Sequence, residues 1–168
     1  MLRYLITLQA PDRTGLVEQI AHAVSRHGGN WLDSELRHID GIFAAILVLE
    51  IPSTNWDDLL DNLECIDGLT LTHASTQAAK APSFKRSYSL VAYDRPGLVL
   101  DISNKINALG INIEHFSSQL ESASHTGVPL FRANFVLGLE ELGKITLLTE
   151  SLYLIGDDVQ LDQIADPA

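Results

Sequence analysis

The segment at residues 12–17, with the sequence DRTGLV, recurs 82 residues later at residues 94–99 as DRPGLV. Two further pairs keep the same offset: Gly28 with Gly110, and Asn30 with Asn112. A register shared over this length is not expected by chance, and a repeat of this size indicates duplicated domains rather than a solenoid. The sequence therefore predicts two homologous halves.

Strand and helix patterns surround the first copy of this segment. Residues 2–9 alternate apolar and polar side chains, the period of a strand with one buried face, and Pro11 ends the pattern. Apolar residues at helical spacing then predict a helix over about residues 14–27. The pair Gly28-Gly29 follows, and it offers the positive-φ positions that stop a helix.

A hairpin and a second helix follow in the first half. Strand-like stretches at residues 31–39 and 42–51 flank Asp40-Gly41, a dipeptide typical of tight hairpin turns because it tolerates positive φ. A helical stripe at residues 56–63 and a short strand at residues 69–73 complete the half. The order strand, helix, strand, strand, helix, strand is the split βαβ plan of ferredoxin-like folds.

The second half repeats this order from Ser87 to about Ile164. We expect domains at residues 1–76 and 85–168, joined by a linker at residues 77–84 that is small, polar and contains a proline. The predicted fold class is α+β: two tandem ferredoxin-like βαββαβ domains, each with an antiparallel sheet and helices on one face.

The halves differ chiefly in the hairpin. Residues 121–129 of the second half replace the tight Asp40-Gly41 turn with an extended loop. This loop is a candidate contact surface, and a solvated hairpin tip is the alternative interpretation.

Charge and cysteine content narrow the function classes. The chain carries 11 basic and 22 acidic residues, a net charge of −11, which repels nucleic-acid backbones and anionic membranes. Cys65 is the only cysteine, so no intrachain disulfide can form. With no signal-peptide pattern at the N-terminus and no apolar stretch of membrane-spanning length, we expect a cytoplasmic protein.

The repeated segment has the chemistry of a small zwitterion site. It lies where the first strand of each half leads into the first helix, whose first-turn N–H groups have no partner within the helix and suit a carboxylate. Gly15 and Gly97 leave that backbone accessible, and Asp12 and Asp94 can accept hydrogen bonds from an ammonium group. Asn30 and Asn112 offer amides that could close the two sites.

A purely structural interpretation of the same residues is equally open. Aspartate before a helix is an ordinary N-cap, and glycine in a turn often serves only the backbone. A duplicated fold would keep such caps in both halves.

The DRTGLV and DRPGLV segments, the paired Gly-x-Asn elements and the βαββαβ order resemble the ACT domain family over nearly the whole chain. Residues 30–34 (NWLDS) and the hairpin ending GVPLF at residues 127–131 resemble, more narrowly, the glycine cleavage system transcriptional repressor group. Thr14 departs from the family motif, which more usually has proline there.

The resemblance implies regulation by a bound amino acid, with domains pairing side by side, and hence a homodimer. The narrower resemblance implies that glycine modulates contact with a transcriptional activator, without direct contact with DNA. The expected ligand-binding residues come from both repeated segments and from the paired asparagines: Asp12, Arg13, Thr14, Gly15, Leu16, Asn30, Asp94, Arg95, Pro96, Gly97, Leu98 and Asn112.

Other functions of this topology are less well supported. An acylphosphatase-like enzyme would use Arg13 and Arg95 on a phosphate, but Asp12 and Asp94 would repel it. An RNA-binding module needs exposed aromatic side chains, whereas the phenylalanines of the central strands lie among core residues. The six histidines are scattered, and no catalytic or nucleotide-binding glycine motif occurs. We therefore expect no catalytic residues, no metal and no cofactor. A scaffold that binds protein and no metabolite stays open as an alternative.

Overall fold

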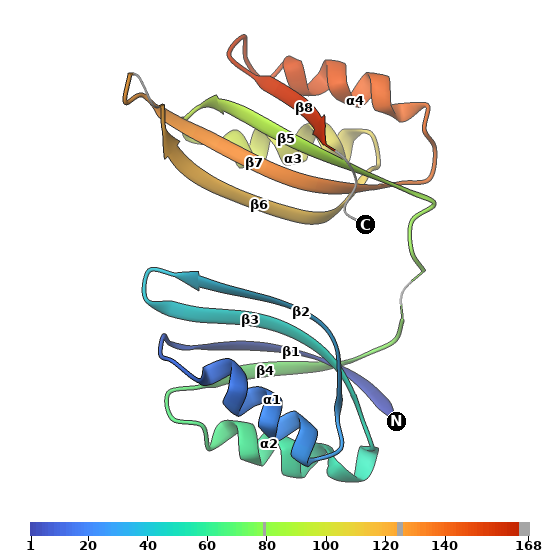
Figure 1. Cartoon of the computed structure of the whole chain (residues 1–168). Coiled ribbons are helices and arrows are strands. Elements are labelled where there is room, and N and C mark those ends of the chain that lie inside the picture. Colours follow the sequence, from blue (N-terminus) through green and yellow to red (C-terminus); the bar gives the residue numbers. More distant parts are fainter. Residues whose placement is uncertain (79, 124–125, 165–168) are drawn as a thin grey trace. The chain divides into compact units, whose positions relative to one another are not determined.

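The computed structural model describes residues 1–78, 80–123 and 126–164. The chain divides into two compact units, Met1–Ala79 and Lys80–Ala168. Each unit has its own four-stranded sheet and its own pair of α-helices (Figure 1).

The first unit has an antiparallel sheet in the order β2-β3-β1-β4. Its central strand β1 pairs with β3 on one side and with β4 on the other. Its elements are β1 (Leu2–Pro11), α1 (Leu16–Arg26), β2 (Asn30–Ile39), β3 (Ile42–Ile51), a 3-10 turn (Ser53–Asn55), α2 (Trp56–Glu64) and β4 (Thr70–Thr76).

The second unit repeats this topology with the strand order β6-β7-β5-β8. Its pairings are again antiparallel throughout. Its elements are β5 (Phe84–Tyr93), α3 (Leu98–Ala108), β6 (Asn112–Ser122), β7 (Pro129–Leu139), α4 (Lys144–Tyr153) and β8 (Gln160–Ile164).

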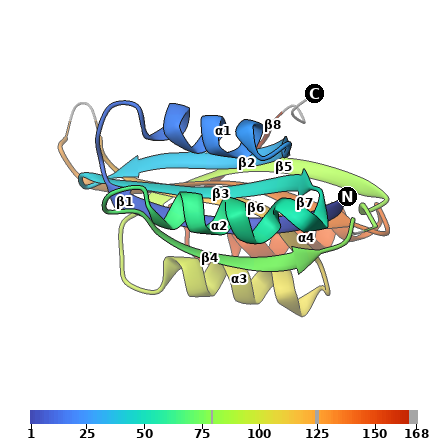
Figure 2. The same cartoon turned by 90° about the horizontal axis from the view of Figure 1, so that it is seen from below.

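Alternation along the strands places the core of the first unit between sheet and helices. Ile6 and Leu8 of β1 are buried, whereas Thr7 and Gln9 point to the opposite, open face. Ile20 of α1 and Leu59 of α2 are fully buried against the same side of the sheet. Figure 2 shows α1 and α2 in front of this sheet face. The second unit has a corresponding core built by β5, β7, α3 and α4.

An aromatic stack fixes the start of α2 against β1. The rings of Tyr4 and Trp56 lie 3.5 Å apart between centroids and are nearly parallel, at 4°. His73 of β4 meets the edge of Trp56 at 5.2 Å. These contacts extend the apolar core toward the end of the sheet where β1 begins.

The predicted βαββαβ order is confirmed in both halves, and so is the Asp40-Gly41 turn. Both turn residues have positive φ, 50° and 80°, as a two-residue hairpin of this type requires. Of the two glycines after α1, Gly28 has positive φ, while Gly29 instead lies so close to Val24 that a Cβ would clash.

The predicted start of the first helix was two residues early. α1 begins at Leu16 because Gly15 has a left-handed backbone. Of the extended hairpin loop predicted at residues 121–129, Ser124 and His125 lie outside the described residues. The domain limits 1–76 and 85–168 and the linker 77–84 stay a prediction.

Candidate functional site

The loop before the first helix has nearly the same backbone in both units. Gly15 has φ 90° and ψ 0°, and Gly97 has φ 93° and ψ −4°. This left-handed conformation strongly favours glycine, because any other L-residue brings its Cβ close to the following carbonyl oxygen. The left-handed conformation that both units share therefore accounts for the glycine at this position of each loop.

Each of these glycines is the residue at which the helix starts. The carbonyl of Gly15 accepts from the N–H of Gln19 at 2.9 Å, and the carbonyl of Gly97 accepts from Asp101 at the same distance. The first-turn N–H groups that follow have no acceptor within the helix. They give each loop a partial positive charge.

Asp12 and Asp94 are not helix caps. The residues at the caps are Gly15 and Gly97, and neither α1 nor α3 has a side-chain hydrogen bond at this end. The two aspartates instead tie the loop to the neighbouring hairpin through their backbone: the N–H of Asp12 donates to Gly41 at 2.8 Å, and that of Asp94 to Pro129 at 3.0 Å. The N-cap alternative is therefore wrong.

Arg13 and Arg95 hold the loop to the turn that precedes the last strand of their unit. Nη2 of Arg13 donates to the carbonyl of Asp67 at 3.0 Å, and Nη2 of Arg95 donates to the carbonyl of Ile155 at 2.7 Å. Arg95 also lies 3.7 Å from Asp101. These guanidinium groups have a structural role whether or not a ligand binds.

Leu16 and Leu98 belong to the core, each only 2% exposed. They can offer a ligand only their backbone N–H. Thr14 and Pro96, just before the glycines, are exposed. The polar side chains that these loops can offer a ligand are therefore those of the two aspartates and the hydroxyl of Thr14.

A hollow of about 430 Å³ lies beside the first loop. The loop and the first turn of α1 form one wall, and the end of the β2–β3 hairpin forms the other. Within it, Nε2 of His38 lies 2.5 Å from Oδ1 of Asp12. Arg13 and Arg37 line the same hollow.

The structure does not bring the asparagines to the loops of their own units. Asn30 pairs with Glu50, which is also opposite Arg3, whereas the loop follows Pro11 at the other end of β1. Pro11 lies eight residues further along β1 than Arg3, or about 26 Å at 3.3 Å per residue. Asn112 likewise pairs with Gly138, opposite Lys85 at the start of β5. The expectation that these amides close the same sites is wrong within a unit.

Asn112 lines a different, smaller hollow of about 270 Å³. Its Nδ2 donates to Oε1 of Glu114 at 2.5 Å. Lys144 lines the same hollow and donates to the carbonyl of Leu109 at 2.9 Å. This arrangement stabilises the end of α3 in the way that Asn55, which donates to the carbonyl of His27, stabilises the end of α1.

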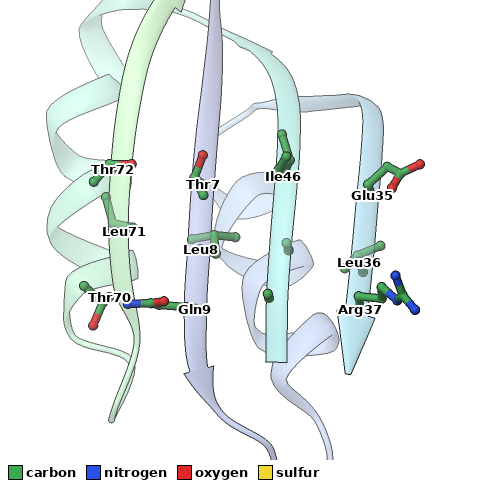
Figure 3. Close-up of a pocket in the computed structure, with 12 residues that line it drawn as sticks. Thr7, Leu8, Gln9, Glu35, Leu36, Arg37, Ile46, Thr70, Leu71 and Thr72 are labelled. Atoms are coloured by element: carbon green, nitrogen blue, oxygen red, sulfur yellow. The ribbon is translucent and has the colours of Figure 1, made fainter. Parts of the chain in front are cut away.

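Sequence reasoning missed a shallow hollow of about 490 Å³ on the open face of the first sheet. Ile46, which is 48% exposed, lies in it, and threonines of β1 and β4 line its rim. Figure 3 shows Glu35 and Arg37 extending from β2 at its edge. The alternation of Thr7 and Gln9 with buried neighbours predicts that this face of the sheet is polar, but it does not predict the hollow.

The core placement predicted for the central-strand phenylalanines is confirmed. Phe43 is 5% and Phe135 is 1% exposed, and Phe131 packs against the second core. No described helix is long and apolar enough to cross a membrane. Among residues 1–78, 80–123 and 126–164, no three or more His, Cys, Asp or Glu side chains are grouped to hold a metal.

Comparisons with known proteins agree with this architecture. Residues 3–66 match the family model of the ACT domain. An unknown protein from Galdieria sulphuraria superposes with a TM-score of 0.80 at 18% identity, over 98% of this chain and 99% of that one. A candidate glycine cleavage system transcriptional repressor superposes with a TM-score of 0.71 at 17% identity, over 98% of both chains.

No curated protein matches the sequence. The two superpositions span both units, and their identities are low enough that they establish the fold alone. The first unit thus matches the ACT domain family over residues 3–66, and the chain as a whole shares its two-unit fold with these two structures.

Proposed function

We propose that this chain is a regulatory protein that senses a small amino acid at the loops Asp12–Leu16 and Asp94–Leu98. The observation that carries the proposal is the duplicated loop itself. In both units an exposed aspartate precedes a left-handed glycine, and that glycine opens a helix with free first-turn N–H groups. Neither aspartate caps its helix, and the one side-chain contact found to these carboxylates among the described residues, from His38 to Asp12, exists in the first unit only. No structural task shared by both units therefore explains the repeated carboxylate.

The loop is complementary to both ends of an α-amino acid. The first-turn N–H groups of α1 and α3 suit the carboxylate of the ligand. The carboxylates of Asp12 and Asp94 suit its ammonium group. The glycines leave room for a ligand to approach the loop backbone closely, since even a Cβ built at Gly97 would meet nothing within 4 Å. Glu18 and Asp101 in the first helical turns oppose a second carboxylate, which favours a ligand with no acidic side chain.

A small effector such as glycine fits these limits. The ACT domain in the first unit supports amino-acid binding, and the candidate glycine cleavage repressor shares the tandem fold over its full length. We propose that binding shifts the population of conformations that contact a partner transcriptional activator. We further propose that the protein acts as a homodimer in the cytoplasm and does not contact DNA itself.

We propose no enzymatic activity and no cofactor. An arginine that cradles a phosphate must direct its N–H groups at the ligand. Nη2 of Arg13 and Nη2 of Arg95 each donate to a backbone carbonyl of their own unit, which leaves fewer of their N–H groups for a phosphate. Asp12 and Asp94 would in addition repel a phosphoryl group at the same loops.

Isothermal titration of the full chain with glycine and serine tests the proposed function. We expect saturable binding that the double variant Asp12→Ala/Asp94→Ala loses. The control is Asp58→Ala, which removes an acidic residue from the first turn of α2, a helix that does not follow a glycine loop of this kind. Binding should survive in the control. Absence of heat with both amino acids would exclude this sensor and favour an interaction protein that needs no metabolite.

A further inference from the structure

Besides Thr14 against Pro96 within the loops, the two proposed sites differ at a position of the neighbouring strand that contacts the first loop. His38 of β2 contacts Asp12 in the first unit. The sequence offset that aligns the loops aligns His38 with Leu120 of β6. The first loop thus has an imidazole over its aspartate, and the second has an aliphatic side chain in the matching place.

Strand pairing confirms that these positions are equivalent. His38 pairs with Phe43, which also pairs with Ala10, two residues before Asp12. Leu120 pairs with Phe131, which also pairs with Ala92, two residues before Asp94. The matching backbone bonds of the two aspartates, at 2.8 and 3.0 Å, place the loops alike against their hairpins.

The contact occupies part of the Asp12 carboxylate. An ionised carboxylate only accepts hydrogen bonds, so Nε2 of His38 must be the donor in the 2.5 Å contact with Oδ1. Among the described residues, no side-chain contact to the Asp94 carboxylate is found. The ammonium group of an amino acid would therefore compete with His38 at the first loop and meet no such competitor among the described residues at the second.

We propose that His38 makes the two loops unequal, so that the second unit binds the amino-acid effector at lower concentration than the first. The inference rests on the proposed function and specifies how its two sites are ordered. The Asp12 and His38 side chains are 33% and 60% exposed, so the contact is partly screened by water. We expect the competition to weaken the first site about two- to fivefold, the range typical of exposed ion pairs.

Carbodiimide labelling tests the occlusion without any need for effector binding. A carbodiimide activates accessible carboxylates and glycine ethyl ester captures them, and peptide mass spectrometry gives the rate at each aspartate. We expect slower labelling of Asp12 than of Asp94 in the unaltered chain. His38→Leu should raise the rate at Asp12 and leave Asp94 unchanged. Equal rates at Asp12 before and after this substitution would overturn the inference.

Glycine titration followed by amide NMR tests the order of binding. The amides of Gly15 and Gly97 report on the two loops separately. We expect Gly97 to respond at lower glycine concentration, His38→Leu to bring Gly15 closer to it, and Leu120→His to weaken the response at Gly97. Both altered side chains are largely exposed, Leu120 at 65%, so both variants should keep the fold, which the spectra themselves verify.

The outcomes separate this inference from the proposed function. Equal responses at both loops, unaffected by either substitution, would refute the inequality and leave the sensor intact. A spectrum without change at either loop would refute the sensor, and with it the ordering of sites that depends on it.

Discussion

Gly97 matters both for the stability of the fold and for the proposed binding loop. Its φ of 93° lies in the left-handed region, and a Cβ there would touch nothing within 4 Å. We therefore expect Gly97→Ala to cost about 1–2 kcal/mol of unfolding free energy from backbone strain alone. The matched control is Gly143→Ala, because Gly143 has φ −60° and equally open surroundings.

Urea unfolding of both variants measures this difference. Gly143→Ala should be neutral or stabilise by up to about 1 kcal/mol, because alanine restricts the unfolded chain. Equal stability of the two variants would show that the left-handed conformation of Gly97 is not maintained in solution. A destabilised but folded Gly97→Ala would also provide a chain in which the loop backbone is strained while its aspartate is intact.

At the scale of elements, the β6–β7 hairpin carries a charge contact that depends on pH. Nε of Arg132 donates to Oε1 of Glu121 at 2.9 Å, and the amide of Gln119 donates to the same oxygen. The hydrogen bond from Arg132 is the main cause, and that from Gln119 the second, of a pKa of Glu121 below its usual value. A lowered folded-state pKa means that ionised Glu121 stabilises the folded state above its unfolded pKa and that this contribution is lost as the pH falls through the folded pKa.

We expect Glu121→Gln to lower the urea midpoint at pH 7 and to have no effect once the pH is well below the range in which carboxylates titrate. The same substitution in an Arg132→Met background should show a smaller pH dependence, because the main partner is gone. Urea midpoints measured from pH 7 down to pH 3 give both comparisons. A pH-independent difference between Glu121→Gln and the unaltered chain would contradict the assignment.

The elements that the sequence predicts well are those that local chemistry determines. Asp40-Gly41 needs no distant partner to form its turn, and the alternation of β1 reports its own burial. The start of α1 was misplaced because a Thr-Gly pair can open a helix at either residue, and only the positive φ of Gly15 decides. The expectation that Asn30 closes the first site is wrong within its unit because Asn30 pairs with Glu50 opposite Arg3, away from the loop that follows Pro11. That position depends on the direction of paired strands and not on a local pattern.

The candidate site was likewise predictable only where it depends on local sequence. Its loops and aspartates follow from the repeat, since a duplicated segment can be recognised within one sequence. The contact between Asp12 and His38 joins residues from different elements, and the hollow on the open sheet face depends on four strands. Both arise from sheet register, so neither has a signature in sequence spacing.

At the scale of the whole molecule, the net charge favours regulation through a protein partner over regulation through direct binding to DNA. A net charge of −11 opposes approach to DNA, whose binding proteins gain affinity by releasing counterions as basic side chains neutralise phosphates. We therefore expect no rise in fluorescence anisotropy of a labelled duplex with this protein at 50 mM salt, where electrostatic binding is strongest. A basic DNA-binding protein of similar size serves as the positive control. Binding at 50 mM salt that is lost at 200 mM would reveal a local basic surface that overcomes the net charge, and it would replace a protein partner with DNA as the target of regulation.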